Sequence, residues 1–184
     1  MGLLLNFLMP VGSLSVYPEI VRLVLLNNPK RILDLGIGNG MNGAGIRNWY
    51  GWECELIGVD GWEGYCNGMW DVYSKVFVMN IEDYVKKDEK FDFIVMTDVI
   101  EHFNLIDGYG LLKRLKEMLT PNGVLLVSTP AIWFEQGAYM GNELERHRSY
   151  WTHANFEECG LTVIGNGDPC NYGHKMILAE YLNK

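Results

Sequence analysis

The sequence contains few residues of the kinds that define specialised structural classes. Its four cysteines, Cys54, Cys66, Cys159 and Cys170, form no C-x-x-C pair and show no metal-like spacing with the four histidines. Neither a zinc module nor a disulfide scaffold is therefore expected. No apolar run approaches the ~18 residues of a membrane-spanning helix. These absences predict a cytoplasmic protein with reduced thiols and no membrane partner.

Basic residues are also scarce, since 15 Lys and Arg stand against 23 Asp and Glu, for a net charge of -8. Proteins that grip nucleic-acid phosphates need clustered Lys and Arg, so nucleic acid is not an expected partner. The 184 residues, 48% of them apolar, suffice for one domain with its own core. We expect a single domain over residues 1–184 that opens with an N-terminal helical segment, residues 1–29. The sequence makes no prediction about oligomeric state.

Glycine is abundant, with 21 residues, and short β-branched runs alternate with helix-like stretches. The expected strands are Arg31–Leu35, Glu55–Val59, Lys75–Met79, Phe91–Met96, Val124–Ser128, Leu161–Ile164 and Lys175–Tyr181. The expected helices are Pro18–Asn28, Met41–Tyr50, Trp62–Trp70, Ile81–Lys87, Gly108–Leu119 and Thr152–Cys159, with a turn at Pro121–Gly123. This alternation predicts a parallel sheet covered on both faces, with ligands at the carboxyl ends of its strands.

A glycine-rich loop follows the first expected strand, with Gly36, Gly38 and Gly40 at alternate positions. Glycines let the chain turn sharply and let a ligand approach the backbone closely. The helix that begins near Met41 presents free N–H groups at its first turn. Gly38, Gly40 and Gly43 also match G-x-G-x-x-G, so a nicotinamide-dependent reductase that uses the Gly38–Gly43 loop is an alternative.

Acidic residues follow or flank three neighbouring strand ends. Asp34 lies two residues before the first glycine, where a carboxylate suits a ligand with cationic groups better than a pyrophosphate. Asp60 ends the second strand, where a carboxylate accepts hydrogen bonds from ribose hydroxyls. Asp98 follows the fourth strand, and Glu101 and His102 come within one turn of it. A nucleoside-like ligand with positive charge fits all three places.

The segment Ile32–Gly40 resembles motif I (D/E-x-G-x-G-x-G) of the class I S-adenosylmethionine-dependent methyltransferases. The resemblance continues in chain order and covers nearly the whole sequence. Its further members are Asp60, the D-V-I-E-H-F segment at 98–103, L-T-P-N-G at 119–123, and His147, Trp151, Phe156, Gly160 and Leu161. The resemblance implies an α/β fold, a three-layer Rossmann-like methyltransferase sandwich whose seven-stranded, mostly parallel sheet has an antiparallel last strand. It also implies S-adenosylmethionine as cofactor and S-adenosylhomocysteine as product.

The resemblance assigns cofactor contacts position by position. It implies the methionine part against Gly36, Gly38 and Gly40, the ribose on Asp60, the adenine between Gly61 and Trp62 and along Asn80, Ile81 and Glu82, and the amino group near Asp98. Position 80 often carries Asp in this family, so Asn80 is a departure. The sulfonium and ammonium of the cofactor are positive, and Asp34 and Asp98 supply a matching negative field.

The catalytic candidates are His102 and Glu101. A hydroxyl acceptor needs a base, and a histidine with a pKa near its ordinary ~6.5 suits that task. Glu101 is expected to tune the imidazole, although the pair could instead cap a helix or anchor a lid. Residues 130–151 are too long for a connecting loop and rich in aromatics, which predicts a substrate lid. The predicted function is methyl transfer to a small-molecule acceptor, first of all O-methylation.

Two further alternatives remain open. Asp98, Glu101 and His102 could form a metal site with Glu145 or His147. That pattern is similar to the small-RNA 2′-O-methyltransferases, which bind a divalent ion through E-x-x-E-H and a downstream histidine. The acidic balance disfavours RNA, and we expect no bound metal. The other alternative is a cofactor-binding subunit without catalytic activity.

Overall fold

A computed structural model describes residues 14–169 and 175–184. Its centre is a seven-stranded sheet with the strand order β3-β2-β1-β4-β5-β7-β6. The strands are β1 (Arg31–Leu35), β2 (Glu55–Asp60), β3 (Lys75–Val78), β4 (Phe91–Thr97), β5 (Leu119–Pro130), β6 (Thr162–Pro169) and β7 (Lys175–Leu182). β7 runs antiparallel to both of its neighbours, whereas the pairs from β3 to β5 are parallel. The predicted sheet, with its antiparallel last strand, is confirmed.

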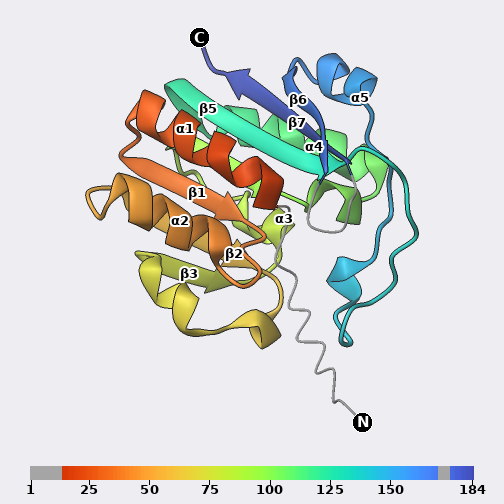
Figure 1. The fold of residues 1–184 in the computed structure, drawn as a ribbon, viewed down its shortest axis with the longest axis horizontal. Coiled ribbons are helices and arrows are strands. Elements are labelled where there is room, and N and C mark those ends of the chain that lie inside the picture. The colour runs from red at the N-terminus through yellow and green to blue at the C-terminus, as the bar shows by residue number, and fades with distance from the viewer. Residues whose placement is uncertain (1–13, 170–174) are drawn as a thin grey trace.

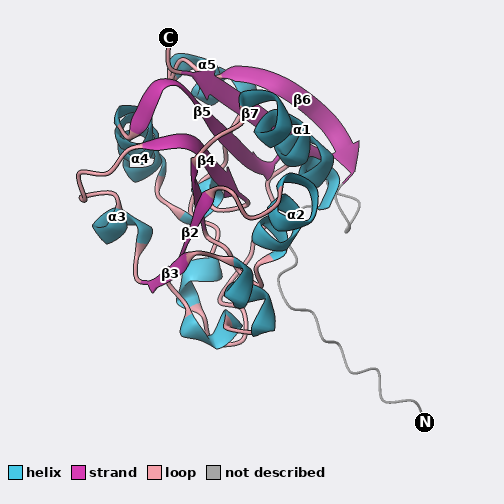
Figure 2. Ribbon diagram, turned by 90° about the vertical axis from the view of Figure 1, so that its left-hand side faces the viewer, coloured by secondary structure: helices cyan, strands magenta, loops and turns pink. Residues whose placement is uncertain are grey.

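Helices cover both faces of this sheet and make three layers. The helices are α1 (Tyr17–Asn27), α2 (Met41–Tyr50), α3 (Ile81–Tyr84), α4 (Leu105–Glu117) and α5 (His153–Glu158), with short 3-10 turns η1 (Leu14–Val16), η2 (Glu63–Tyr65), η3 (Gly68–Val72), η4 (Ile100–His102) and η5 (Glu143–Glu145). Figures 1 and 2 show α1 and α2 on one face, with α3 and α4 on the other. The three-layer prediction is confirmed.

The central strand β4 explains why both faces need helices. Phe93 and Val95 pack with α1 and α2, whereas Ile94 and Met96 pack with α3 and α4. All four side chains are fully buried. A near-continuous apolar run is what a parallel strand buried on both faces requires. The strand therefore ends inside the molecule, and the polar residues after it emerge at one edge of the sheet.

The expected helix Trp62–Trp70 is wrong, because two 3-10 turns, η2 and η3, occupy most of this stretch. Cys66 and Asn67 interrupt it with extended backbone, and the Asn67 side chain accepts a hydrogen bond from the N–H of Met69. Asparagine favours such caps over helix interiors. Trp70 is held separately, since its indole N–H donates to the carbonyl oxygen of Gly38 at 2.8 Å. The aromatic side chains follow these local bonds rather than a helical stripe.

Several boundaries also differ from the sequence prediction. α4 begins at Leu105, three residues earlier than expected, and α3 ends at Tyr84. β5 begins at Leu119 and includes the predicted turn at Pro121–Gly123, because Leu119 pairs with Phe91 across a register shift. Residues 1–13 of the expected N-terminal segment lie outside the described residues, as does Cys170. Within the described ranges, no helix has the length and apolar character needed to cross a bilayer.

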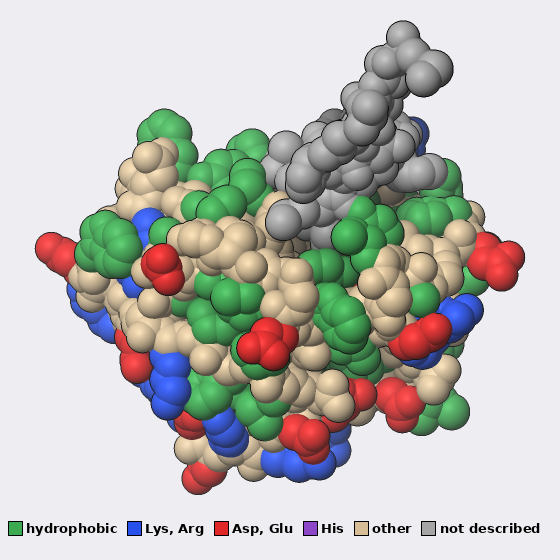
Figure 3. Space-filling view, turned by 90° about the horizontal axis from the view of Figure 1, so that it is seen from below, with side chains coloured by type: hydrophobic (Ala, Val, Ile, Leu, Met, Phe, Trp, Pro, Cys, Tyr) green, Lys and Arg blue, Asp and Glu red, His purple; other side chains and the backbone are tan. Residues whose placement is uncertain are grey.

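Figure 3 shows the molecule from below, relative to the view in Figure 1. On the described part of this face, acidic and basic side chains are interspersed with apolar groups, and the basic ones form no continuous stripe. Proteins that track a nucleic-acid backbone carry such a stripe. This face therefore offers no basic track to a phosphate backbone.

Candidate functional site

The loop between β1 and α2 needs its glycines for conformation and for space. Gly36, Gly38 and Gly40 have φ values of 73°, 51° and 88°, in the left-handed region that other residues rarely adopt. A Cβ on Gly36 would lie 2.3 Å from Cγ2 of Val99, the residue that leads into η4. The loop thus brings the ends of β1 and β4 into contact, as a ligand site shared by both strands requires.

Gly43 has a different role. Its N–H donates to the hydroxyl of Tyr73 at 3.1 Å, and a Cβ there would lie 2.3 Å from the Tyr73 ring. The third glycine of the G-x-G-x-x-G match therefore packs against a buried tyrosine inside the protein. Close packing of a helix explains it without a dinucleotide.

Asp60 faces the glycine loop from the end of β2. Its two carboxylate oxygens accept hydrogen bonds from the N–H groups of Gly38 and Trp62, each at 2.8 Å. Burial raises the pKa of Asp60 to about 6, against the effect of these two donors. Among the described residues, no lysine or arginine forms an ion pair with it. Each oxygen keeps a lone pair for a further donor such as a hydroxyl.

Asp34 lies beneath the loop rather than on its open face. It is completely buried, and its carboxylate accepts hydrogen bonds from the Tyr73 hydroxyl at 2.6 Å and from the Asn42 amide at 3.4 Å. Burial raises its pKa to about 6. Direct contact between Asp34 and a cofactor stays a prediction, and the structure gives Asp34 a supporting position under α2.

Replacing Asp34 by asparagine is expected to flatten the pH dependence of stability. Its pKa is about 6 when folded and 3.8 ordinarily, so its contribution to stability is complete below the ordinary value and is lost as the pH rises through about 6. Between about pH 4.5 and 7, the wild-type free energy of unfolding should fall by about 2 kcal/mol more than that of Asp34→Asn. Urea unfolding at the two pH values checks this, and equal falls in both proteins would contradict it.

The predicted adenine edge is assembled from the ends of β2 and β3. A Cβ built on Gly61 would lie 3.4 Å from Oδ1 of Asn80, the residue directly before α3, so these two positions are neighbours. The same Cβ would lie 2.4 Å from Cδ1 of Leu144. Sequence reasoning missed Leu144, because only the folded lid brings η5 to the end of β2. Trp62 follows Gly61 directly, and Ile81 and Glu82 open α3.

Beyond β4, Asp98 has a left-handed backbone with φ of 55°. Its N–H donates to the carbonyl oxygen of Ser128 at 3.1 Å, which ties it to the end of β5. Glu101 follows and is 3% exposed. Its carboxylate accepts a hydrogen bond from the Thr129 hydroxyl at 3.0 Å. Burial, and then the negative charge of Asp98, raise the pKa of Glu101 well above its ordinary value.

His102 and His147 lie next to each other although they are far apart in the sequence. Their ring centroids lie 5.1 Å apart. Nδ1 of His102 lies 3.3 Å from the carbonyl oxygen of Arg146, and Nδ1 of His147 lies 3.0 Å from that of Phe134. Burial lowers the pKa of both imidazoles; for His102 the carbonyl oxygens of Arg146 and Asp98 oppose that effect.

The segment 130–151, the predicted lid, is fastened to η4 by its backbone. The carbonyl oxygen of Glu101 accepts the N–H groups of Arg148 and Ser149, at 2.8 and 3.1 Å. The Arg148 guanidinium donates to the carbonyl oxygens of His102 and Glu143, and Arg146 pairs with the Glu143 carboxylate. Both arginines therefore have partners within the protein, which disfavours them as holders of an anionic acceptor.

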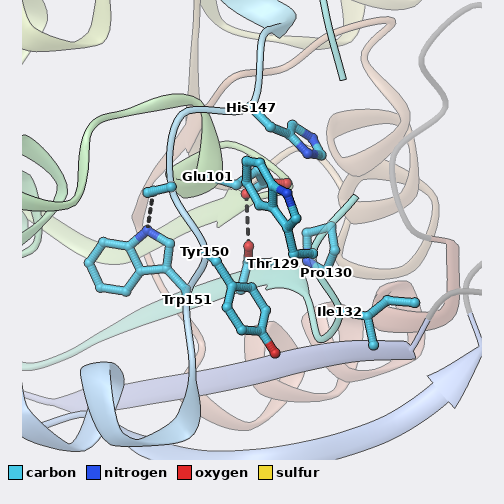
Figure 4. Close-up of a pocket in the computed structure, with 9 residues that line it drawn as sticks. Glu101, Thr129, Pro130, Ile132, His147, Tyr150 and Trp151 are labelled. Carbon is cyan, nitrogen blue, oxygen red and sulfur yellow. Dashed lines mark hydrogen bonds between the residues drawn. The ribbon is translucent and has the colours of Figure 1, made fainter. Parts of the chain in front are cut away.

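A small cavity of about 10 Å³, room for roughly one water molecule, lies between residues 130–151 and the end of β5, next to Glu101 (Figure 4). It is lined by Glu101, Thr129, Pro130, Ile132, Trp133, His147, Ser149, Tyr150 and Trp151. Figure 4 shows the Glu101–Thr129 hydrogen bond, with His147 above it and Tyr150 and Ile132 below it in this view. Trp151 is completely buried and donates its indole N–H to Ser149. The pocket thus combines aromatic walls with one carboxylate and one imidazole.

Comparison with known proteins identifies relatives. A family model described as "Methyltransferase domain" matches residues 15–163. A ubiquinone biosynthesis O-methyltransferase from Azorhizobium caulinodans is 29% identical over 106 residues, which make up 54% of this chain and 40% of the relative. The match therefore spans less than half of that relative's length.

Solved structures share the fold at low identity. The N-methyltransferase NodS from Bradyrhizobium japonicum, solved with S-adenosylhomocysteine, has a TM-score of 0.64 and 16% identity, over 92% of this chain and 86% of NodS. A 1,6-didemethyltoxoflavin-N1-methyltransferase from Burkholderia thailandensis, solved with its named substrate and S-adenosylhomocysteine, has a TM-score of 0.68 and 14% identity, over 92% and 79%. Because the family model covers most of the chain, this protein belongs to the class I S-adenosylmethionine-dependent methyltransferases.

Proposed function

We propose that this chain transfers a methyl group from S-adenosylmethionine to a small-molecule acceptor, with oxygen as the accepting atom. The observation that carries the proposal is Asp60, a buried carboxylate held across the glycine loop by two backbone N–H groups. The O-methyltransferase relative supports oxygen as the acceptor atom. The cofactor, when bound, supplies a methyl group already activated by a sulfonium.

The chain's own residues would bind and orient the cofactor. Asp60 accepts hydrogen bonds from vicinal ribose hydroxyls. Gly36, Gly38 and Gly40 let the methionine part approach the backbone, because none of them carries a side chain. Asn80 offers an amide at the adenine edge. The carboxylate of Asp98 would hold the ammonium of the cofactor. Fixing both reactants in line supplies much of the acceleration of such a displacement.

The acceptor side has a group for the proton. A neutral His102 imidazole can receive the proton of an acceptor hydroxyl, and burial favours that neutral form. Glu101 directly precedes His102 in the sequence, and it lines the cavity. Trp133 and Tyr150 border the cavity, which has to widen to admit an acceptor, and their rings favour a flat, largely apolar one. With Arg146 and Arg148 occupied elsewhere, we expect a neutral acceptor rather than an anionic one.

Thermal unfolding with added ligands tests the cofactor and separates the reductase alternative. S-adenosylhomocysteine at 100 times its Kd should stabilise the protein by about 2.7 kcal/mol, whereas NADH at the same concentration should have no effect. Stabilisation by NADH alone would overturn the methyltransferase proposal. Transfer of labelled methyl groups to a metabolite pool then tests for catalysis, and a chain that binds the cofactor but labels nothing would favour the non-catalytic alternative.

A further inference from the structure

We propose that Glu101, His102 and His147 form a binding site for one divalent transition-metal cation beside the acceptor pocket. The cation's catalytic role rests on the proposed function, but its binding does not. This proposal replaces the expectation of a metal-free site.

The three side chains already converge. One ligand atom from each lies within 4.8 Å of the other two. Glu101 and His102 come from η4, whereas His147 comes from the lid, so the fold rather than the local sequence brings them together. Ligand atoms that share a cation at about 2.0–2.2 Å lie roughly 3 Å apart. Asp98 and Glu145, weighed as ligands from the sequence, are not members of this group.

The hydrogen bonds around the cluster match those of metal ligands. Nδ1 of His102 faces the carbonyl oxygen of Arg146, and Nδ1 of His147 faces that of Phe134. In a neutral imidazole, an Nδ1–H that donates to a carbonyl leaves the lone pair on Nε2. Metal-ligating histidines almost always have such a partner on the other nitrogen. The hydroxyl of Thr129 likewise holds the carboxylate of Glu101.

The charge balance favours a cation at this place. Among the described residues, no lysine or arginine forms an ion pair with the buried Glu101. The nearby guanidinium of Arg148 donates to backbone carbonyl oxygens instead. A buried carboxyl group with no cationic partner is costly to ionise, and a metal cation that replaces its proton supplies that partner. Two imidazole nitrogens with one carboxylate oxygen favour Mn²⁺, Fe²⁺, Co²⁺ or Zn²⁺ over Ca²⁺ and Mg²⁺.

The position of the cluster gives the cation a task. Glu101 and His147 also line the pocket, so a cation held by three protein ligands keeps coordination positions for an acceptor oxygen. A bound cation lowers the pKa of that hydroxyl, and its proton leaves to solvent. The oxygen then forms a bond to the methyl carbon, the carbon–sulfur bond breaks, and its electron pair stays on sulfur. With a cation bound, His102 is a ligand, and the acceptor loses its proton without an imidazole base.

Titration with Co²⁺ tests the site on the full-length chain, without a histidine tag and without cofactor. We expect one Co²⁺ per chain and visible absorption bands typical of nitrogen ligation, with Zn²⁺ as competitor. His147→Ala, His102→Ala and Glu101→Gln should each weaken Co²⁺ binding at least about tenfold, since each removes a ligand. Glu143→Gln is the matched control, because Glu143 is an exposed lid carboxylate outside the cluster. It should bind Co²⁺ like the wild type.

The outcomes separate this proposal from the proposed function. A wild-type chain that binds no stoichiometric Co²⁺ up to about 1 mM overturns the site, as do folded His102→Ala and His147→Ala variants that bind like the wild type. Circular dichroism identifies any variant that fails to fold, and the wild-type titration then decides alone. Failure to bind S-adenosylhomocysteine would overturn the proposed function but leave a positive Co²⁺ titration standing.

Discussion

Replacing Asp60 by alanine is expected to weaken S-adenosylhomocysteine binding by at least about 100-fold. The carboxylate would accept two hydrogen bonds from the ribose, and bonds to charged groups contribute about 1.5–3 kcal/mol each. The substitution would also leave the glycine loop less well held, because Oδ2 of Asp60 accepts a hydrogen bond from the N–H of Gly38. Isothermal titration of the variant against the wild type measures the change.

Glu63→Ala is the matched control for Asp60→Ala. Glu63 is an exposed acid three residues further along, and it makes no side-chain hydrogen bond in the described structure. Its loss should leave affinity unchanged. Wild-type affinity should also fall as the pH drops below about 6, where Asp60 becomes protonated. An Asp60→Ala chain that binds as tightly as the wild type would remove Asp60 from the cofactor site.

With a chelator present, so that no cation is bound to His102, replacing His102 by alanine is expected to reduce turnover by about 100-fold or more while cofactor affinity stays the same. The imidazole comes from η4, and its Nδ1 faces the carbonyl oxygen of Arg146. Single-turnover methyl transfer, measured beside titration with S-adenosylhomocysteine, separates the two effects. Loss of both together would indicate a structural role.

The pH profile tells a proton acceptor from a residue that only holds the lid. If His102 receives the proton, the wild-type rate rises through its pKa, which burial keeps below the ordinary 6.5, and is level at higher pH. His102→Ala should lose that rise. His153→Ala, which removes a histidine from α5, serves as control and should keep both rate and profile. Unchanged turnover in His102→Ala would exclude His102 from the reaction.

The strands could be predicted because their sequence is constrained on both faces. Phe91–Met96 is almost wholly apolar, so both of its faces need cover, and a parallel sheet with helices on each face provides it. The strand is observed as predicted. The stretch Trp62–Trp70 could not be predicted in the same way. Its backbone follows single hydrogen bonds, such as that from Trp70 to Gly38, which depend on a loop 32 residues away.

The site could be predicted as far as strand ends determine it. Asp60 and Asp98 follow parallel strands, so the edge they share is a consequence of topology. The burial of Asp34 depends on Tyr73, which donates a hydrogen bond to its carboxylate. The contact between His102 and His147 depends on how residues 130–151 fold back over η4. Neither leaves a periodic signal in the sequence. Leu144 was missed for the same reason.

The lid carries Leu144 against Gly61 and, three residues later, His147 against His102. We expect a ligand that binds beside Gly61 to displace Leu144 and, through this short segment, to shift His147. Cofactor and acceptor are therefore expected to bind as thermodynamically linked ligands. If cofactor binding changes the affinity for the acceptor by some factor, acceptor binding must change the affinity for the cofactor by the same factor.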